Sequence, residues 1–223
     1  LTVIKTKSGE NFLKCEEDCF RLYPFIEGSR TIEKISDSRD LYYAGLGFGR
    51  FGKMLGDFPS ERLYETIPDF HNTPKRVSAL RAAIERDKSG RANLCRAEAE
   101  EYLAAEKIAF SVTAEIEKGT VPLRVTHNDT KINNILFDEK SGNPLCVIDL
   151  DTVMPGSVLY DFGDALRFGA STAAEDERDI EKVKFSLEAF TAFAKGYLEE
   201  MRGVLTKKEI ELLPISAALM TYE

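Results

Sequence analysis

The middle of the chain changes its hydrophobic period. Residues 123–126, 135–137 and 146–149 are short runs of β-branched and apolar residues, which are typical of β-strands. Residues 141–144, Ser-Gly-Asn-Pro, supply a turn between the last two runs, which therefore predict a β-hairpin. Because helical periodicity lies on both sides of this stretch, we expect a small β unit enclosed within a mainly helical domain.

Helical patterns account for most of the remaining chain. Apolar residues recur at helical spacing over about 40–55, and further helical segments are expected over about 74–87 and 97–118. After Asp161 the pattern is helical to the end of the chain, with breaks near Ser171 and Gly203. The predicted fold class is α+β, mainly helical with a central β-hairpin.

The N-terminus predicts a separate small β piece. Residues 2–4 and 11–13 flank a turn at 8–10. Residues 19–26 show the side-chain alternation of a strand and are rich in residue types that favour β-strands. We therefore expect a hairpin followed by a strand before the helical domain begins.

The polar loop after the first central strand has a distinctive spacing. His127, Asp129 and Asn134 fit the pattern H-x-D-x-x-x-x-N of the protein-kinase catalytic loop, and Asp149 follows on the predicted hairpin. A carboxylate in an extended loop can accept the proton of an attacking hydroxyl, while an Asn carbonyl and a second Asp can converge on Mg²⁺. Since Asp is depleted in apolar strands unless it has a partner, a chance match is the weaker reading. The spacing therefore predicts phosphoryl-transfer chemistry.

At these residues the sequence resembles the aminoglycoside phosphotransferase/choline kinase family, which contains small-molecule relatives of protein kinases. The correspondence rests on His127-Asn128-Asp129, Ile148-Asp149-Leu150 and Tyr160-Asp161-Phe162. Asn128 stands where glycine is usual in the family. The resemblance implies a kinase-like C-terminal lobe whose centre is the catalytic hairpin.

Longer matches resemble one branch of that family, the N-acetylhexosamine 1-kinases. They cover residues 126–131, 147–156 and 160–164, and the loop at 66–73 adds to them. The branch shares the Asn in the catalytic loop. The resemblance extends over about residues 20–223.

The resemblance implies a role for each motif residue. Asp129 would be the catalytic base, and Asn134 and Asp149 would be ligands of Mg²⁺. Asp161 would brace the catalytic loop, and His127 would orient it rather than transfer protons. ATP is the implied phosphoryl donor.

Other positions carry weaker expectations. Asp151 either contacts a second metal ion or caps the turn at 152–153. His71 is either a solvated or capping group or a contact of the acceptor, and Arg91 and Arg167 are either acceptor contacts or scaffold residues. The segment that would receive adenine, the hinge, has the candidate residues Arg21, Tyr23, Phe25 and Glu27.

Two further patterns imitate nucleotide-binding motifs. Residues 47–52 fit G-x-G-x-x-G, but they lie inside a helical pattern and follow no strand directly, so we interpret them as small residues on a packed helix face. Val3-Ile4-Lys5 imitates the strand that carries a phosphate-binding lysine. No glycine-rich loop precedes it, and we interpret Lys5 as an exposed strand residue.

Composition excludes several other classes of protein. The net charge of −8 disfavours nucleic acid and anionic membrane surfaces as partners, and no apolar window is long enough to cross a membrane. Four cysteines and two histidines provide neither a disulfide framework nor a zinc motif, which favours reduced cysteines in a cytoplasmic protein. The expected partners are ATP and a small sugar, and the sequence carries no signal for an oligomeric state.

The ends of the chain predict a piece of a longer protein. The sequence begins at Leu1 without an initiator Met and stops inside a helical pattern. We expect residues 1–27 to be the remnant of an N-terminal β lobe with the hinge, and residues 28–223 to be the helical catalytic lobe. Because residues 1–18 are too short for a glycine-rich loop and a lysine strand, this chain itself is expected to be inactive.

The predicted activity is phosphorylation of a sugar hydroxyl, at the anomeric position of an N-acetylhexosamine. The alternatives are another acceptor within the same family (choline, homoserine, an aminoglycoside or a thiosugar) and a non-catalytic kinase-like scaffold. A glycosidase is disfavoured because Asp149 and Asp151 lie on the same side of one strand rather than across a sugar.

Overall fold

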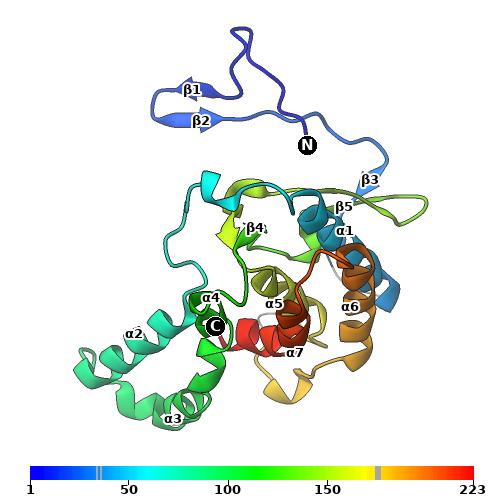
Figure 1. The fold of residues 1–223 in the computed structure, drawn as a ribbon. Coiled ribbons are helices and arrows are strands. Elements are labelled where there is room, and N and C mark those ends of the chain that lie inside the picture. Colours follow the sequence, from blue (N-terminus) through cyan, green and yellow to red (C-terminus); the bar gives the residue numbers. More distant parts are fainter. Residues whose placement is uncertain (34, 36, 174–176) are drawn as a thin grey trace.

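Helices make up the main body of the computed structural model, which describes residues 1–33, 35, 37–173 and 177–223 (Figure 1). The α-helices are α1 (Ser38–Met54), α2 (Thr73–Arg86), α3 (Arg96–Ala104), α4 (Thr113–Glu117), α5 (Val158–Gly169), α6 (Leu187–Met201) and α7 (Lys207–Tyr222). The 3-10 helices are η1 (Ser60–Arg62), η2 (Ala92–Cys95), η3 (Glu106–Phe110), η4 (Ile132–Asn134), η5 (Leu150–Thr152) and η6 (Ile180–Lys182).

Short antiparallel strands form three small sheets in the described parts of the chain. The pairs are β1 with β2, β4 with β7, and β5 with both β3 and β6. Figure 1 shows the β1–β2 hairpin standing apart from the helical body. The strands are β1 (Leu13–Cys15), β2 (Asp18–Phe20), β3 (Ser29–Arg30), β4 (Arg124–Thr126), β5 (Ile135–Asp138), β6 (Pro144–Val147) and β7 (Met154–Gly156).

Glycines allow α1 and α6 to approach each other closely. A Cβ atom on Gly45 would lie 2.3 Å from the Phe193 carbonyl oxygen, and one on Gly196 would lie 2.1 Å from that of Tyr42. Gly49 faces the α6 backbone in the same way. The G-x-G-x-x-G match at 47–52 therefore belongs to helix packing, as predicted.

Helix α5 lies at the centre of the hydrophobic core. Phe162 is fully buried, and its ring meets those of Phe193 and Tyr197 from α6 with centroids 5.5 and 5.3 Å away. Two acidic residues of α5, Asp161 and Asp164, are also buried, at 7% and 6% exposure. Because buried carboxylates require hydrogen-bond donors, Asp161 and Asp164 must each be paired with polar groups of a neighbouring segment.

The predictions of two helices and of the central hairpin are confirmed. Helices α1 and α2 match the expected segments 40–55 and 74–87, and Pro74 occupies the first turn of α2. The central hairpin forms with Ile135 opposite Val147. No helix among the described residues is both long and apolar enough to cross a membrane. All four cysteines are free.

Three predictions differ from the structure. The N-terminal hairpin turns between Cys15 and Asp18 instead of at 8–10, and residues 2–4 form no strand: Ile4 donates a single backbone hydrogen bond to Leu22. The strand expected over 19–26 ends at Phe20, before Pro24, which has no N–H to donate to a sheet. The helix expected over 97–118 divides into α3, η3 and α4, which brings Ala109 and Val112 into the core at 0% exposure.

Candidate functional site: a braced polar loop and neighbouring cavities

A buried carboxylate fixes the start of the polar loop. Asp161 Oδ2 accepts the N–H of His127 at 2.9 Å, and Oδ1 accepts the N–H of Asn128 at 2.8 Å. Burial raises the pKa of Asp161, and the two N–H donors oppose this shift. The loop backbone is thereby attached to α5 through Asp161, the residue for which the family resemblance implies a bracing role.

A second acid of α5, Asp164, extends this attachment. Its Oδ2 accepts the Thr130 N–H at 2.8 Å, and the Thr130 hydroxyl donates to the Asp161 carbonyl at 2.6 Å. Arg167 donates to Asp164 Oδ1 from Nε and Nη2, both at 3.2 Å. Sequence reasoning missed Asp164. The available signal was its position three residues after Asp161, on the same face of α5.

Asn128 adopts a conformation that favours glycine. Its φ is 66°, in the left-handed region that Asn tolerates better than most residues. The side-chain amide donates to the Thr152 carbonyl at 2.9 Å and accepts from the Thr126 hydroxyl at 3.0 Å. This explains how Asn stands where the resembled family usually has Gly.

The hydrogen bonds of His127 determine its tautomer. Nε2 lies 2.9 Å from the Ile148 carbonyl oxygen, which only accepts, and Nδ1 accepts the Asp129 N–H at 3.3 Å. The proton must therefore sit on Nε2. The ring is fully buried, so His127 connects the loop to the Ile148 strand end and is not placed to exchange protons.

Asp129 and Asn134 lie against each other. The Asn134 amide nitrogen donates to the Asp129 carbonyl at 2.9 Å and to its Oδ2 at 3.1 Å. The Asp129 side chain is 31% exposed, and Lys131 Nζ lies 3.9 Å from its Oδ1. Asp129 thus presents a carboxylate to solvent while its backbone is held in place.

Strand pairing brings Asp149 beside Asn134. Ile148 donates its N–H to the Asn134 carbonyl at 2.9 Å, continuing the β5–β6 pairing by one residue. Asp149 follows in a left-handed conformation with φ 58°, and its side chain is exposed.

These residues fit a magnesium ion bound together with phosphates. The Asn134 amide nitrogen is occupied by Asp129, which leaves Asn134 Oδ1 and the Asp149 carboxylate as oxygen ligands of the type Mg²⁺ prefers. No group of three His, Cys, Asp or Glu residues suited to a metal occurs in the described chain. Mg²⁺ commonly uses one or two protein ligands and takes the remainder from substrate phosphates and water.

A cavity of about 410 Å³ opens beside Asp149, between this strand end and the hinge segment. Arg21, Tyr23 and Phe25 line it, whereas Glu27 does not. Arg21 forms an ion pair with Asp151, so Asp151 contacts the hinge. Leu136 and Ile148 supply apolar surface to the same cavity.

A second cavity, of about 390 Å³, includes Asn128 of the polar loop in its wall. His71 lines it, with Nδ1 2.9 Å from Glu223 Oε1 and a side chain that is 10% exposed. Its ring centroid is 4.9 Å from that of Tyr160. His71 is therefore a largely enclosed group at a cavity that Asn128 of the polar loop also lines, not a solvated one.

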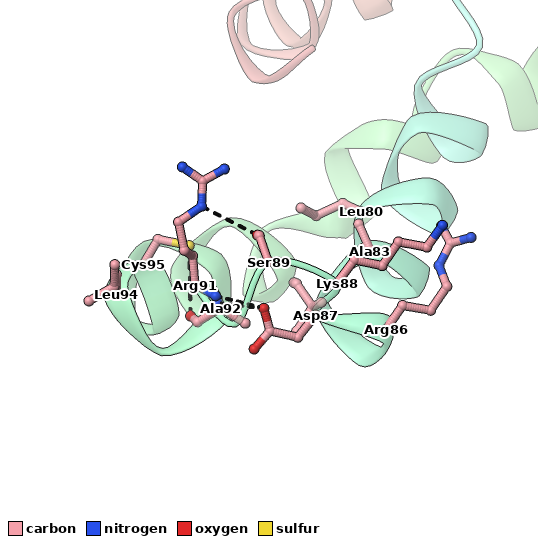
Figure 2. Close-up of a pocket in the computed structure, with 11 residues that line it drawn as sticks. Leu80, Ala83, Arg86, Asp87, Lys88, Ser89, Arg91, Ala92, Leu94 and Cys95 are labelled. Carbon is pink, nitrogen blue, oxygen red and sulfur yellow. Dashed lines mark hydrogen bonds between the residues drawn. The ribbon is translucent and has the colours of Figure 1, made fainter.

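The structure places Arg91 elsewhere. It lies between α2 and η2 and lines a cavity of about 630 Å³, where its Nε donates to the Ser89 hydroxyl (Figure 2). Figure 1 shows α2 and α3 extending away from β4. Arg91 is not brought together with the loop, and Arg167 contacts Asp164, which in turn accepts from the loop.

Comparison with known proteins finds solved structures with a similar fold. The chain is similar to a crystal structure of a spectinomycin phosphotransferase, APH(9)-Ia, in complex with ADP and spectinomycin, at 14% identity and a TM-score of 0.54 over 98% of this chain. It is also similar to an aminoglycoside-3'-phosphotransferase of type VIII, at 16% identity and a TM-score of 0.51, covering 96% of this chain and 73% of that one. The chain spans 63% of the spectinomycin phosphotransferase.

These likenesses show a kinase-like fold shared with aminoglycoside phosphotransferases, of mixed α/β composition. Independently, residues 5–198 match the family described as the phosphotransferase enzyme family, APH. That match includes the whole braced loop, the hairpin and both acids of α5. On this evidence the chain belongs to the phosphotransferase enzyme family.

Proposed function

We propose that the protein is a Mg²⁺- and ATP-dependent phosphotransferase that phosphorylates the anomeric hydroxyl of an N-acetylhexosamine. The observation that carries this proposal is the contact of the Asn134 amide with Asp129, together with the backbone pairing of Asn134 and Ile148 that sets Asp149 at the wall of a cavity bordered by the hinge segment. The choice of acceptor is supported by the resemblance of the loop and strand motifs to N-acetylhexosamine 1-kinases.

Each group has a defined task in this reaction. The acceptor oxygen forms a bond to the γ-phosphorus of ATP, the bond to the β,γ-bridging oxygen breaks, and ADP leaves. Asp129 takes the hydroxyl proton. Asn134 and Asp149 would hold Mg²⁺, which neutralises charge on the phosphates when bound. Asp161 and His127 position the loop that carries Asp129.

The hinge segment would receive the adenine. Leu136 and Ile148 provide the apolar surface on which a base can lie, and Tyr23 and Phe25 border the same space. In this proposal the phosphates would extend toward Asp149, which lines the same cavity. The catalytic contribution is then mainly positioning and charge stabilisation.

The test is transfer of radiolabelled γ-phosphate from ATP by the full-length protein across a panel of acceptors. The panel contains GlcNAc, GalNAc, choline, homoserine, a thiosugar and an aminoglycoside, with Asp129→Asn as the matched control. We expect labelled sugar 1-phosphate from the wild type only, and none from the 223-residue chain. Labelling of another acceptor would replace the proposed substrate, and no labelling with any acceptor would favour a non-catalytic scaffold.

A further inference from the structure

The cavity that contains His71 is built around polar atoms that lack partners. Among the described residues, three buried side-chain atoms have no hydrogen-bond partner: His71 Nε2, Thr113 Oγ1 and Asn133 Oδ1. Both His71 and Thr113 line the 390 Å³ cavity. Because buried polar groups are normally hydrogen-bonded, two such atoms at one cavity point to a ligand that supplies the missing bonds.

The contacts of His71 define which kind of bond is missing. The Glu223 carboxylate can only accept, so the hydrogen at the 2.9 Å contact sits on Nδ1. In the neutral ring Nε2 is then an acceptor and requires an O–H or N–H from the ligand. Phe70 and Tyr160 lie against the ring with centroids 4.6 and 4.9 Å away, which restricts its orientation.

The cavity wall belongs to the loop at 65–72, α4 and β7. The Ile67 N–H contacts Met154 Sδ at 3.3 Å, and the Thr66 hydroxyl donates to the Asp151 carbonyl at 3.5 Å, so the loop is attached next to β7. A volume of about 390 Å³ lies near the small end of ligand cavities, which hold roughly 300–1,000 Å³. This size suits a single-ring molecule.

The charged groups of the cavity wall are engaged locally. Asp69 forms an ion pair with Lys75 and accepts from the Asn72 amide, and its N–H donates to Glu65 Oε1 at 3.0 Å. The aromatic rings of Phe70 and Tyr160 face His71 instead of forming an open cage for a quaternary ammonium group. The wall therefore favours hydroxyl groups over a permanent cation.

From this geometry we propose that His71 and Thr113 are the specificity-determining pair for the acceptor, which is a neutral, hydroxylated single-ring molecule. One ligand O–H or N–H donates to His71 Nε2, and the Thr113 hydroxyl bonds a neighbouring polar group. This inference rests on the proposed function, since it places the acceptor beside the loop that carries Asp129. It adds Thr113, which no sequence motif identifies.

The test is calorimetric titration of the 223-residue chain with GlcNAc and, separately, with choline chloride. Thr113→Val removes the hydroxyl and keeps the shape of the side chain, whereas Thr113→Ser keeps a hydroxyl. The matched control is Thr191→Val, which removes a threonine hydroxyl on the exposed face of α6. We expect GlcNAc binding that Thr113→Val weakens about tenfold, that Thr113→Ser largely retains and that Thr191→Val leaves unchanged. His71→Phe keeps an aromatic ring without Nε2 and is expected to lose binding as well.

Three results would overturn the inference: no binding of GlcNAc at millimolar concentration, equal binding of choline, or equal losses in Thr113→Val and Thr191→Val. The failure of the proposed function looks different. If the full-length protein phosphorylates GlcNAc and Thr113→Val leaves KM unchanged, only the specificity pair is wrong. If no acceptor is phosphorylated but Thr113→Val still weakens GlcNAc binding, the cavity assignment holds and the kinase proposal falls.

Discussion

The polar loop and the hinge segment serve the same candidate site but are held in different ways. The backbone N–H groups of His127, Asn128 and Thr130 bond to buried carboxylates of α5. The hinge segment contacts the site through an ion pair between Arg21 and Asp151, whose side chains are 45% and 68% exposed. Bonds within a desolvated network are stronger and more specific than an exposed ion pair.

This difference separates two requirements of phosphoryl transfer. The proposed base, Asp129, and the proposed metal ligands, Asn134 and Asp149, need a fixed geometry, which the helical core supplies through α5 and the β5–β6 hairpin. The nucleotide has to enter and leave, and the exposed hinge segment, with Phe25 at 84% exposure, imposes little constraint of its own. We infer that the catalytic constellation is preformed by the helical body, independently of the β piece.

The largest expected effect comes from replacing Asp129, the proposed catalytic base. Asp129→Asn should lower kcat of the full-length protein by roughly 10²–10⁴, the range for loss of a general base. Binding of Mg-ATP should stay nearly unchanged, because the backbone of residue 129 remains attached to the same loop. Steady-state kinetics and equilibrium nucleotide binding check both parts. A kcat within threefold of wild type would contradict the assignment.

The next effect distinguishes the two acids near the hinge. Asp149→Ala should weaken Mg-ATP binding at least about tenfold, since even indirect supports of metal ligands cost that much. Asp151→Ala, which loses only the exposed contact to Arg21, is the matched control and should change the Mg²⁺ dependence little. Titration of Mg²⁺ at fixed ATP compares the two. Equal losses would make Asp151 a metal ligand.

Breaking the brace should reduce stability. Asp161→Asn places an N–H₂ group against one of two backbone N–H donors in a buried position, which costs about 1–3 kcal/mol for the unsatisfied group. Asp37→Asn is the control, because Asp37 caps α1 and Asn caps about as well. Urea denaturation of both variants measures the difference. If the two substitutions shift the midpoint equally, Asp161 is not a structural brace.

The stability of the fold is expected to depend on pH through Glu223, which contacts His71. Burial opposes ionisation of Glu223, but hydrogen bonds from His71 and Thr73 outweigh it and hold its pKa below the ordinary value of 4.5. A lowered pKa in the folded state adds stability above about pH 4.5, and this stability is lost as the pH falls through the folded value.

Glu223→Gln should remove that contribution. Thermal midpoints measured from neutral to acidic pH should fall less steeply in the variant than in the wild type. Glu211→Gln, on the exposed side of α7, serves as the control for removing one carboxylate. Parallel curves for wild type and Glu223→Gln would contradict the contact.

The smallest effect belongs to the hinge. Arg21→Ala removes an exposed ion pair and should change the free energy of unfolding by about 0–1 kcal/mol. The same urea titration that detects Asp161→Asn checks it. A loss as large as that of Asp161→Asn would show that the hinge also holds the folded body together.

The sequence predicted those parts of the molecule that local patterns determine. Helices α1 and α2 have a regular apolar period, and α2 begins at the Asn72 cap with Pro74 in its first turn. The β5–β6 hairpin is defined by its turn. The division of 97–118 could not be predicted, because it depends on tertiary burial of Ala109 and Val112.

The candidate site divides in the same way. The spacing of the motif predicted that Asp129, Asn134 and Asp149 belong to one site. Their roles remain predictions. Asp164 and Thr113 have no motif, since their positions matter only once α5 meets the loop and α4 meets the cavity. The placement of Arg91 at a distant cavity likewise depends on how α2 and α3 extend from the body.

Amide hydrogen exchange of the 223-residue chain, resolved by residue, tests most directly whether the helical body holds the catalytic loop on its own. The N–H groups of His127, Asn128 and Thr130 are expected to exchange only on global unfolding, because each is bonded to a buried carboxylate. Amides of the exposed β1–β2 hairpin should exchange far faster. Equal, fast exchange in both regions would contradict a preformed catalytic loop.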